Sequence, residues 1–242
     1  MTSNNSHPAQ SGAKQRVLVN VILDKSGSMS SKVNDVIGGF NFYLDELAKE
    51  PAVDYGFSLT LFDTVVEIRY KAVPLSQVVR LDGSTYRPSG NTALFDAIGN
   101  TVQTVNADGF DKVVTVIMTD GEENSSREWT RQAICELIQG KEAAGNWTFV
   151  FLGANLDAFA QGASLGVPMA NAVRYDPAHY RRVYASLAKS TNAYSAGKAR
   201  VTVDFFEGKA EGIKKAEMTG NYPGWMKRGV AVVKATVKRL VV

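Results

Sequence analysis

Residues 16–28 read RVLVNVILDKSGS, an almost unbroken apolar run that ends in a short polar loop. A run that is apolar at nearly every position, and not at alternate ones, is typical of a strand buried on both faces of a parallel sheet. Beyond the loop, Val33, Phe40 and Leu47 recur at helical spacing, and Pro51 follows the last of them. The stretch therefore predicts a strand, a loop and a helix, which together begin a βαβ unit.

The same alternation continues along the chain. An antiparallel hairpin is predicted where two strand-like segments are separated only by Asp63 and Thr64. Strands are expected at 16–23, 55–62, 65–72, 112–118, 147–152 and 172–175, with an extended closing segment at 201–206. Helices are expected at 33–47, from Thr92 to Val105, around 129–138, at 157–165 and at 180–194. This order predicts an α/β, doubly wound fold, in which a mainly parallel central sheet has one antiparallel edge strand and helices on both faces.

The composition is that of a soluble globular protein. Of the 242 residues, 45% are hydrophobic and 21% are charged, which is enough apolar material for one large α/β domain. A single cysteine, Cys135, excludes an intrachain disulfide framework, and two histidines, His7 and His179, argue against a histidine-rich metal centre. No apolar run reaches membrane-spanning length and the N-terminus lacks a signal-peptide core. The expected location is therefore the cytoplasm, of the producing cell or of a host cell if a phage encodes the protein.

Three segments are expected from the distribution of polar and charged residues. Residues 1–14 predict a disordered leader, residues 15–206 the folded domain, and residues 207–242 a basic C-terminal extension. Residues 220–242 hold five basic residues and no acid, whereas the net charge of the whole chain is only +3. No nucleic-acid-binding surface is therefore expected on the domain itself. We expect the extension to dock on the domain or on a partner protein, in preference to a membrane surface.

Small oxygen-bearing side chains gather where predicted strands end or predicted helices begin. They lie in three loops, Asp24-Lys25-Ser26-Gly27-Ser28, Gly90-Asn91-Thr92 and Thr119-Asp120-Gly121. In a doubly wound sheet, ligands bind at the carboxyl ends of the strands, near the point where the strand order reverses. Hard cations such as Mg²⁺ require compact oxygen ligands, which short carboxylate and hydroxyl side chains supply. The three loops therefore predict one divalent-metal site at this edge of the sheet.

The same three motifs carry a resemblance to a known family. The pattern D-x-S-x-S after the first strand, a distant Thr, and T-D-G after the fourth strand resembles the metal-ion-dependent adhesion site of von Willebrand factor type A (vWA) domains. The flanking words DKSGSM, TALFDAIG and MTDGEENSS look like bacterial and phage members, and the resemblance covers about residues 16–206. It implies that Ser26 and Ser28 ligate Mg²⁺ or Mn²⁺ directly and Thr92 directly or through water. Asp24 and Asp120 would act mainly through water and hydrogen bonds.

The resemblance also implies a function. The chain would be a protein-binding module and not an enzyme, in which the bound metal captures an exposed Asp or Glu of a partner protein. Related domains often work with AAA+ ATPases, so an ATPase of this type is a second candidate partner. Two alternatives stay open at this stage: a hydrolase that uses the same ion to activate water, and a structural subunit of an assembly or phage particle. Serine hydrolase chemistry at Ser26 with Lys25 as base is disfavoured, because adjacent side chains usually point in different directions.

Taken singly, the motif residues have ordinary interpretations. Ser26–Ser31 could cap the following helix, Thr92 could be a helix N-cap, and Asp120-Gly121 could be a simple turn. Three acidic residues near the site are expected to be solvated surface: Asp96, Glu122 and Glu123. Cys135 is expected to be a small buried residue, and the tyrosines of the last helix are expected to pack in the core: Tyr180, Tyr184 and Tyr194.

Overall fold

The computed structural model describes residues 14–153, 158–174, 180–197, 205 and 206. Its strands are β1 (Gln15–Asp24), β2 (Val53–Phe62), β3 (Val66–Pro74), β4 (Lys112–Thr119), β5 (Trp147–Gly153) and β6 (Ala172–Arg174). Its α-helices are α1 (Val33–Leu47), α2 (Leu94–Thr104), α3 (Arg131–Ala143), α4 (Ala158–Ser164) and α5 (Tyr180–Ser195). Short 3₁₀ helices are η1 (Gly27–Lys32), η2 (Leu75–Gln77) and η3 (Met169–Asn171).

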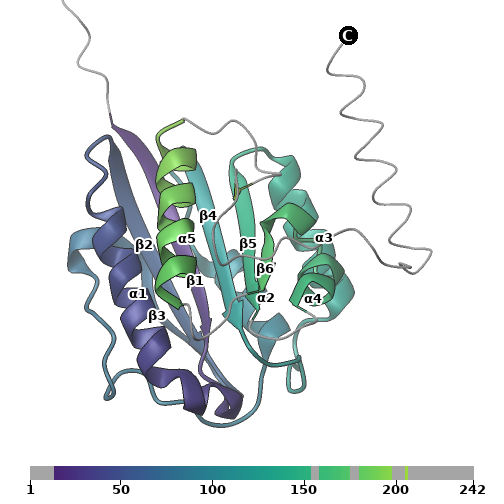
Figure 1. Ribbon diagram of the computed structural model, residues 1–242. Coiled ribbons are helices and arrows are strands. Elements are labelled where there is room, and N and C mark those ends of the chain that lie inside the picture. Colours follow the sequence, from purple (N-terminus) through teal and green to yellow (C-terminus); the bar gives the residue numbers. More distant parts are fainter. Residues whose placement is uncertain (1–13, 154–157, 175–179, 198–204, 207–242) are drawn as a thin grey trace, which may run out of the picture.

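One six-stranded sheet forms the centre of the domain, in the order β3-β2-β1-β4-β5-β6 (Figure 1). All neighbouring strands are parallel except β2 and β3, which form an antiparallel pair at one edge. The chain builds outward from β1 to β3 and then returns to the other side of β1 with β4. The strand order therefore reverses between β1 and β4. The predicted fold class is confirmed, including the single antiparallel edge strand.

Helices cover both faces of the sheet because β1 is apolar on both faces. Val17, Val19 and Val21 belong to the core that also contains the buried residues of α1 and α5, whereas Leu18 and Ile22 belong to the core under α2 and α3. Figure 1 shows α1 and α5 side by side across the near face. This alternation along one strand is the physical reason for the three-layer architecture.

Buried polar contacts fix α5 against its neighbours. The hydroxyls of Tyr43 and Thr191 lie 2.8 Å apart, and the Tyr184 hydroxyl donates to Sδ of Met118 at 2.9 Å. Tyr184 and Tyr194 are buried, so the core prediction is confirmed for these two tyrosines. The side chain of Tyr180 lies outside the described part of the structure.

Two predicted helix starts differ from the structure. The helix expected from Thr92 begins two residues later, at Leu94, and the helix expected around 129–138 begins at Arg131. Trp129 therefore precedes the helix that it was predicted to belong to, because Thr130 ends the preceding loop. The Thr130 hydroxyl accepts a hydrogen bond from the Ala133 amide and so caps the first turn.

Several predicted segments lie outside the described residues: the disordered leader, the basic extension and most of the closing segment at 201–206. The last two residues of that segment, Phe205 and Phe206, are described and are buried in the core under α1 and α5. Among the described residues, no helix combines the length and the hydropathy needed to cross a membrane.

Candidate metal-binding site

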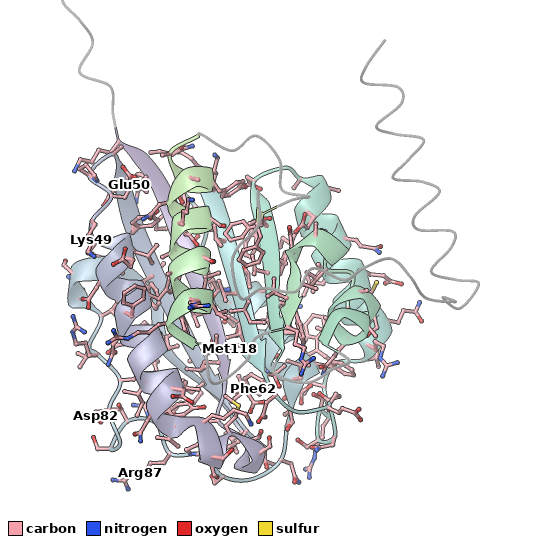
Figure 2. The ribbon with its side chains drawn as sticks, viewed as in Figure 1. Lys49, Glu50, Phe62, Asp82, Arg87 and Met118 are labelled. Carbon is pink, nitrogen blue, oxygen red and sulfur yellow. The ribbon has the colours of Figure 1, made fainter. Side chains whose placement is uncertain are left out.

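The predicted site residues lie at the carboxyl end of the sheet, at the lower edge in Figure 1. β1 ends at Asp24 and β4 ends at Thr119, and the two strands are paired up to Leu23 and Met118. Figure 2 marks this end with Phe62 and Met118, while Lys49 and Glu50 mark the opposite end. The loops that leave β1 and β4 therefore start side by side, at the point where the strand order reverses.

Asp24 is a fully buried carboxyl group at the centre of the cluster. Its Oδ1 accepts a hydrogen bond from the Ser26 amide at 2.6 Å, and its Oδ2 accepts one from the Thr119 hydroxyl at 2.6 Å. Burial raises the pKa of Asp24 above its ordinary value; these hydrogen bonds lower it in part, and the nearby charge of Asp120 raises it further. The hydrogen bonds of the protein thus stabilise the ionised carboxylate of Asp24 only in part. A cation beside Asp24 would stabilise it further.

Two serine hydroxyls lie between Ser26, whose amide contacts Asp24, and the carboxylate of Asp120. Oγ of Ser26 and Oγ of Ser28 lie 3.1 Å apart, and the Ser28 hydroxyl donates to Oδ1 of Asp120 at 2.5 Å. Ser26 is buried, whereas Ser28 is exposed. The row of oxygens therefore runs from buried Asp24 to exposed Ser28 and on to Asp120, whose side chain is largely buried.

Thr92 reaches the same row from the loop before α2. It is buried, its amide donates to Oδ1 of Asn124 at 2.9 Å, and its carbonyl accepts from the Asn124 amide at 3.0 Å. A Cβ atom placed on Gly121 would lie 2.9 Å from Oγ1 of Thr92 and 3.6 Å from Oγ of Ser28. Both hydroxyls thus border one small space beside Gly121, which stays free because that residue has no side chain.

Lys32 was not identified by the sequence analysis, yet it contacts the site directly. Its Nζ forms an ion pair with Oδ2 of Asp120 and lies 3.5 Å from the carbonyl oxygen of Ser28. Both side chains are largely buried, with 19% of Lys32 and 4% of Asp120 exposed. The partners are 88 positions apart in the chain, so no local pattern could have indicated the pair.

A second ion pair, between Lys25 and Asp63, holds the first loop against the β2–β3 turn. Nζ of Lys25 lies 2.5 Å from Oδ2 of Asp63. Burial raises the pKa of Asp63, but the hydrogen bonds from Lys25 and from the Val65 amide outweigh it and leave the pKa below its ordinary value. The Asp63 carbonyl accepts from the Ala93 amide at 2.8 Å, and the Lys25 carbonyl accepts from the Ser89 amide at 2.8 Å. The pair therefore fixes the segment that carries Thr92.

Glycine is required at one point of this segment. Gly90 has a φ of +66°, and a Cβ there would lie 2.7 Å from Oγ1 of Thr64. Its carbonyl accepts a hydrogen bond from the Gly27 amide at 3.1 Å. The close approach joins the first and second site loops through their backbones.

The solvated-surface interpretation was wrong for two of the three nearby acids. Asp96 is buried, and its carboxylate accepts hydrogen bonds from the amides of Arg127, Glu128 and Trp129. Glu123 is partly buried and accepts from the amides of three residues: Phe95, Ser125 and Ser126. Glu122 is exposed, as expected. These two carboxylates satisfy the backbone of the loop after Asp120 and so fix its path.

The capping interpretations of the motif residues were also wrong. The N-cap of α1 is Lys32 and that of α2 is Ala93, and neither side chain caps its helix. Ser26 precedes η1, again without a side-chain cap. The oxygens of Ser26, Ser28 and Thr92 are thus not used to begin helices.

The burial predicted for Cys135 was also wrong. Cys135 is partly exposed, and the partial burial of its thiol raises the pKa of that group.

The donor set fits a small hard cation. Its side chains present three hydroxyls and two carboxylates, all oxygen ligands of the type that Mg²⁺ and Mn²⁺ prefer. Within the described ranges, no three His, Cys, Asp or Glu side chains gather as a metal cluster. Metal binding at this site would therefore depend on the three hydroxyls. The site predicted from the sequence has the same dependence.

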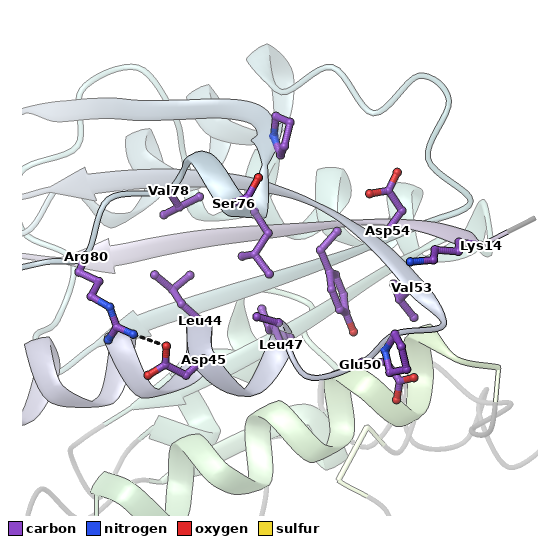
Figure 3. A pocket seen from close by; sticks show the side chains of 15 residues that line it. Lys14, Leu44, Asp45, Leu47, Glu50, Val53, Asp54, Ser76, Val78 and Arg80 are labelled. Atoms are coloured by element: carbon purple, nitrogen blue, oxygen red, sulfur yellow. Dashed lines mark hydrogen bonds and ion pairs between the residues drawn. The ribbon is translucent and has the colours of Figure 1, made fainter.

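Two hollows lie at the other end of the sheet. One, of about 470 Å³, is bordered by the end of α1, the start of β2 and η2 (Figure 3). A second, of about 560 Å³, lies between the ends of α2 and α3 and the start of β5. In the first, Arg80 is ion-paired with Asp45 at the rim, and both side chains are exposed. Neither hollow contains any of the five predicted site residues.

Comparison with known proteins gives a fold and no closer relationship. No protein-family model and no curated protein matches the chain. Among solved structures, proximal thread matrix protein 1 from the mussel byssus is 14% identical, with a TM-score of 0.56 over 74% of this chain and 47% of that chain.

Two further solved structures have the same architecture. A von Willebrand factor type A protein from Catenulispora acidiphila is 17% identical, with a TM-score of 0.51 over 75% of this chain and 43% of that one. The vWF domain of the type V pili tip protein Mfa5 from Porphyromonas gingivalis is 12% identical, with a TM-score of 0.56 over 76% and 97%. This chain thus spans less than half of the first two proteins, and at these identities the likeness shows a vWA-type fold alone.

Proposed function

We propose that this protein is a divalent-metal-dependent protein-binding module that recognises an exposed Asp or Glu on a partner. The carrying observation is a chain of hydrogen bonds at the carboxyl ends of β1 and β4: the Ser26 amide donates to Asp24, the hydroxyls of Ser26 and Ser28 lie 3.1 Å apart, and the Ser28 hydroxyl donates to Asp120. Thr92 borders the same space beside Gly121. The fold alone would not support this function, because one fold serves many functions.

Each of these residues has a distinct part in the proposal. Ser26 and Ser28 would hold Mg²⁺ or Mn²⁺ through their hydroxyl oxygens, with Thr92 at the side from which a partner approaches. Asp24 and Asp120 would supply negative charge and orient the hydroxyls, as Asp120 already does for Ser28. When bound, the ion supplies a concentrated positive charge that favours an anionic partner group. The exposure of Ser28 supports access from solvent.

The proposal includes no catalytic step. Two basic side chains lie in the first site loop and the 3₁₀ helix after it, Lys25 and Lys32, and each is held in an ion pair with a carboxylate. Each of these side chains is thus engaged by a carboxylate and is not free to act as a general base. A binding role is therefore favoured over hydrolysis at the same site.

The proposal is tested by metal-dependent capture. The purified chain is immobilised, and an array of short peptides that carry a central Asp or Glu is applied in Mg²⁺ or in EDTA. Peptides with Asn or Gln at the same position are the matched ligands, and Asp108→Ala is the matched protein variant. Asp108 is an exposed carboxylate between α2 and β4, at the opposite end of the sheet. We expect retention of acidic peptides in Mg²⁺, loss in EDTA, and no effect of Asp108→Ala.

Other outcomes would favour the remaining alternatives. Retention that is unchanged in EDTA would contradict the metal-dependent mechanism. Metal binding without any carboxylate preference would favour a structural subunit in which the ion only stabilises the fold. Metal-dependent hydrolysis of phosphoester or peptide substrates that disappears in Ser26→Ala would favour the hydrolase.

A further inference from the structure

Lys32 occupies an unusual position for a basic side chain, because it is paired with a proposed metal ligand. It is the last residue of η1 and stands at the N-cap of α1, so its backbone is held between two helices. Its ammonium contacts Oδ2 of Asp120, while Oδ1 of the same carboxylate accepts from Ser28. Both oxygens of Asp120 are thus engaged by side chains of this chain.

This pair is one of two ion pairs among the described residues whose side chains are largely buried. Arg80 and Asp45, by contrast, are about half exposed, and solvent screens such pairs strongly. The other largely buried pair joins Lys25 to Asp63, which is not a proposed ligand. Among the described residues, Lys32 is therefore the cation that directly neutralises the proposed metal site.

We propose that Lys32 is a built-in competitor of the divalent cation. The inference rests on the proposed function, because it concerns the same site. Asp24 and Asp120 together offer two negative charges, and the ammonium of Lys32 cancels one of them. A divalent ion beside Asp120 and the ammonium would repel each other over a few ångströms in a poorly solvated site. Binding therefore requires the ammonium to move away from Asp120, and the cost of that movement weakens the affinity for the metal.

The same charge has the opposite effect on the partner. With a divalent ion in place, the two aspartates and the ion balance, and Lys32 leaves a net positive charge next to exposed Ser28. An anionic ligand would be attracted to this charge, whereas a free divalent ion would be repelled by it. Lys32 thus lowers affinity for the metal alone and raises affinity for a carboxylate once the metal is bound.

The test compares Mn²⁺ binding by wild type, Lys32→Met and Lys49→Met. Lys49 follows α1 at the far end of the sheet, where Figure 2 labels it, and its partner is the neighbouring Glu46. Its replacement changes the net charge equally without touching the site. Removing the ammonium from Asp120 should raise the Mn²⁺ affinity about tenfold in Lys32→Met, which corresponds to about 1.4 kcal/mol. Lys49→Met should bind as wild type does.

A second readout uses the wild-type protein, so that the inference does not depend on the folding of one variant. The ¹⁵N resonance of the Lys32 ammonium, assigned through Lys32→Arg, should shift when Mg²⁺ is added, and that of Lys49 should not. An acidic peptide retained by Mg²⁺-loaded wild type should bind Mg²⁺-loaded Lys32→Met less tightly.

The outcomes separate this inference from the function on which it rests. Equal Mn²⁺ affinity in wild type and Lys32→Met, or weaker binding by Lys32→Met, would overturn the competitor while leaving the binding module intact. Mn²⁺ binding by Lys32→Met but not by wild type would support the inference most strongly, because the ammonium of Lys32 would then block the ion completely. Absence of Mn²⁺ binding in every variant, including Lys32→Met, would overturn the proposed function and this inference together.

Discussion

The two ends of the central sheet both carry buried or partly buried carboxyl groups, but these groups have different surroundings. At the carboxyl end, Asp24 and Asp120 are connected through the Ser26 amide and the hydroxyls of Ser26 and Ser28, and the row opens to solvent at Ser28. At the amino end, Glu142 of α3 accepts a single hydrogen bond from the Phe149 amide, near the start of β5. The two hollows described above are also at the amino end.

The polar groups at the two ends distinguish the proposed site from the hollows. The rim of the hollow in Figure 3 carries an exposed ion pair that already satisfies Asp45. At the carboxyl end the oxygens converge and Asp24 is incompletely compensated. Converging polar groups that need a counter-charge, and not empty space, are what indicate ligand binding here.

The largest effect is expected from removing a carboxylate at the carboxyl end. Asp24→Ala and Asp120→Ala should each weaken Mn²⁺ binding by about 100-fold, because each removes a charge that offsets the ion. Asp45→Ala, at the amino end, should leave the affinity unchanged. Calorimetric titration measures all three, with circular dichroism to show that the variants are folded. Unchanged Mn²⁺ affinity in both Asp24→Ala and Asp120→Ala would contradict the proposal that the metal binds at the carboxyl end of the sheet and not at the amino end.

A carboxyl group at the amino end should affect stability instead of binding. Burial raises the pKa of Glu142 to about 7 from an ordinary 4.5, and the hydrogen bond from Phe149 lowers it only in part. The folded state thus holds this proton more tightly than the unfolded state. Its stabilising contribution is complete below pH 4.5 and is lost as the pH rises toward 7.

We therefore expect Glu142 to lower the free energy of unfolding by about 2 kcal/mol between pH 4.5 and pH 7. Glu142→Gln should abolish this contribution, because an amide does not titrate and its oxygen can still accept from Phe149. Urea unfolding of both proteins across the pH range measures the difference. Parallel pH profiles for wild type and Glu142→Gln would show that Glu142 is not the titrating group.

A smaller effect is expected where the site depends on an absent side chain. Gly121→Ala would place a methyl group 2.9 Å from Oγ1 of Thr92, so Thr92 must shift. We expect Mn²⁺ affinity to fall about tenfold, or about 1.4 kcal/mol. Gly140→Ala is the control, because nothing lies within 4 Å of a Cβ there and the residue is in α3. That variant should bind normally and gain about 0.5–1 kcal/mol of stability. Equal binding by both alanine variants would indicate that the space beside Gly121 is not used.

The smallest effects are expected from the neutral ligands. Ser26→Ala and Ser28→Ala should each cost about 1 kcal/mol of metal-binding free energy, the magnitude of a lost hydrogen-bonding group. Thr92→Ala should change metal affinity less than it changes the affinity for an acidic peptide, because the proposal places Thr92 where the peptide carboxylate would approach the ion. Calorimetry with metal alone and then with peptide separates the two effects. A Thr92→Ala variant that loses metal and peptide affinity equally would assign Thr92 to the metal in the free protein.

Local patterns in the sequence predicted the sheet and the candidate ligands, but not the side-chain contacts that hold the ligand loops in place. Unbroken apolar runs predicted β1, β4 and β5 to within a residue or two, because strands buried on both faces need apolar residues at every position. Asp24 and Ser26 were identified because their motif is contiguous with β1. The start of α2 was wrong by two residues, because the backbone of Ala93 is not helical (φ −90°, ψ 62°).

Contacts between distant loops could not be predicted in the same way. The pairs Lys32–Asp120 and Lys25–Asp63 join residues 88 and 38 positions apart. Asp96 was wrongly expected to be solvated. Its carboxylate accepts backbone amides from the loop after β4, which passes over α2, and the residues around Asp96 in the sequence do not indicate that contact. Such pairs follow from how the loops stack on the finished sheet, and short-range spacing does not contain that information.

A crystal structure of the protein soaked in Mn²⁺, with anomalous diffraction, tests the central claim most directly. The account predicts one strong anomalous peak at the carboxyl ends of β1 and β4, about 2.1 Å from the hydroxyl oxygens of Ser26 and Ser28. It also predicts that the ammonium of Lys32 has moved away from Asp120. A well-diffracting crystal with no peak at this position, or with a peak only at the amino end of the sheet, would contradict the account.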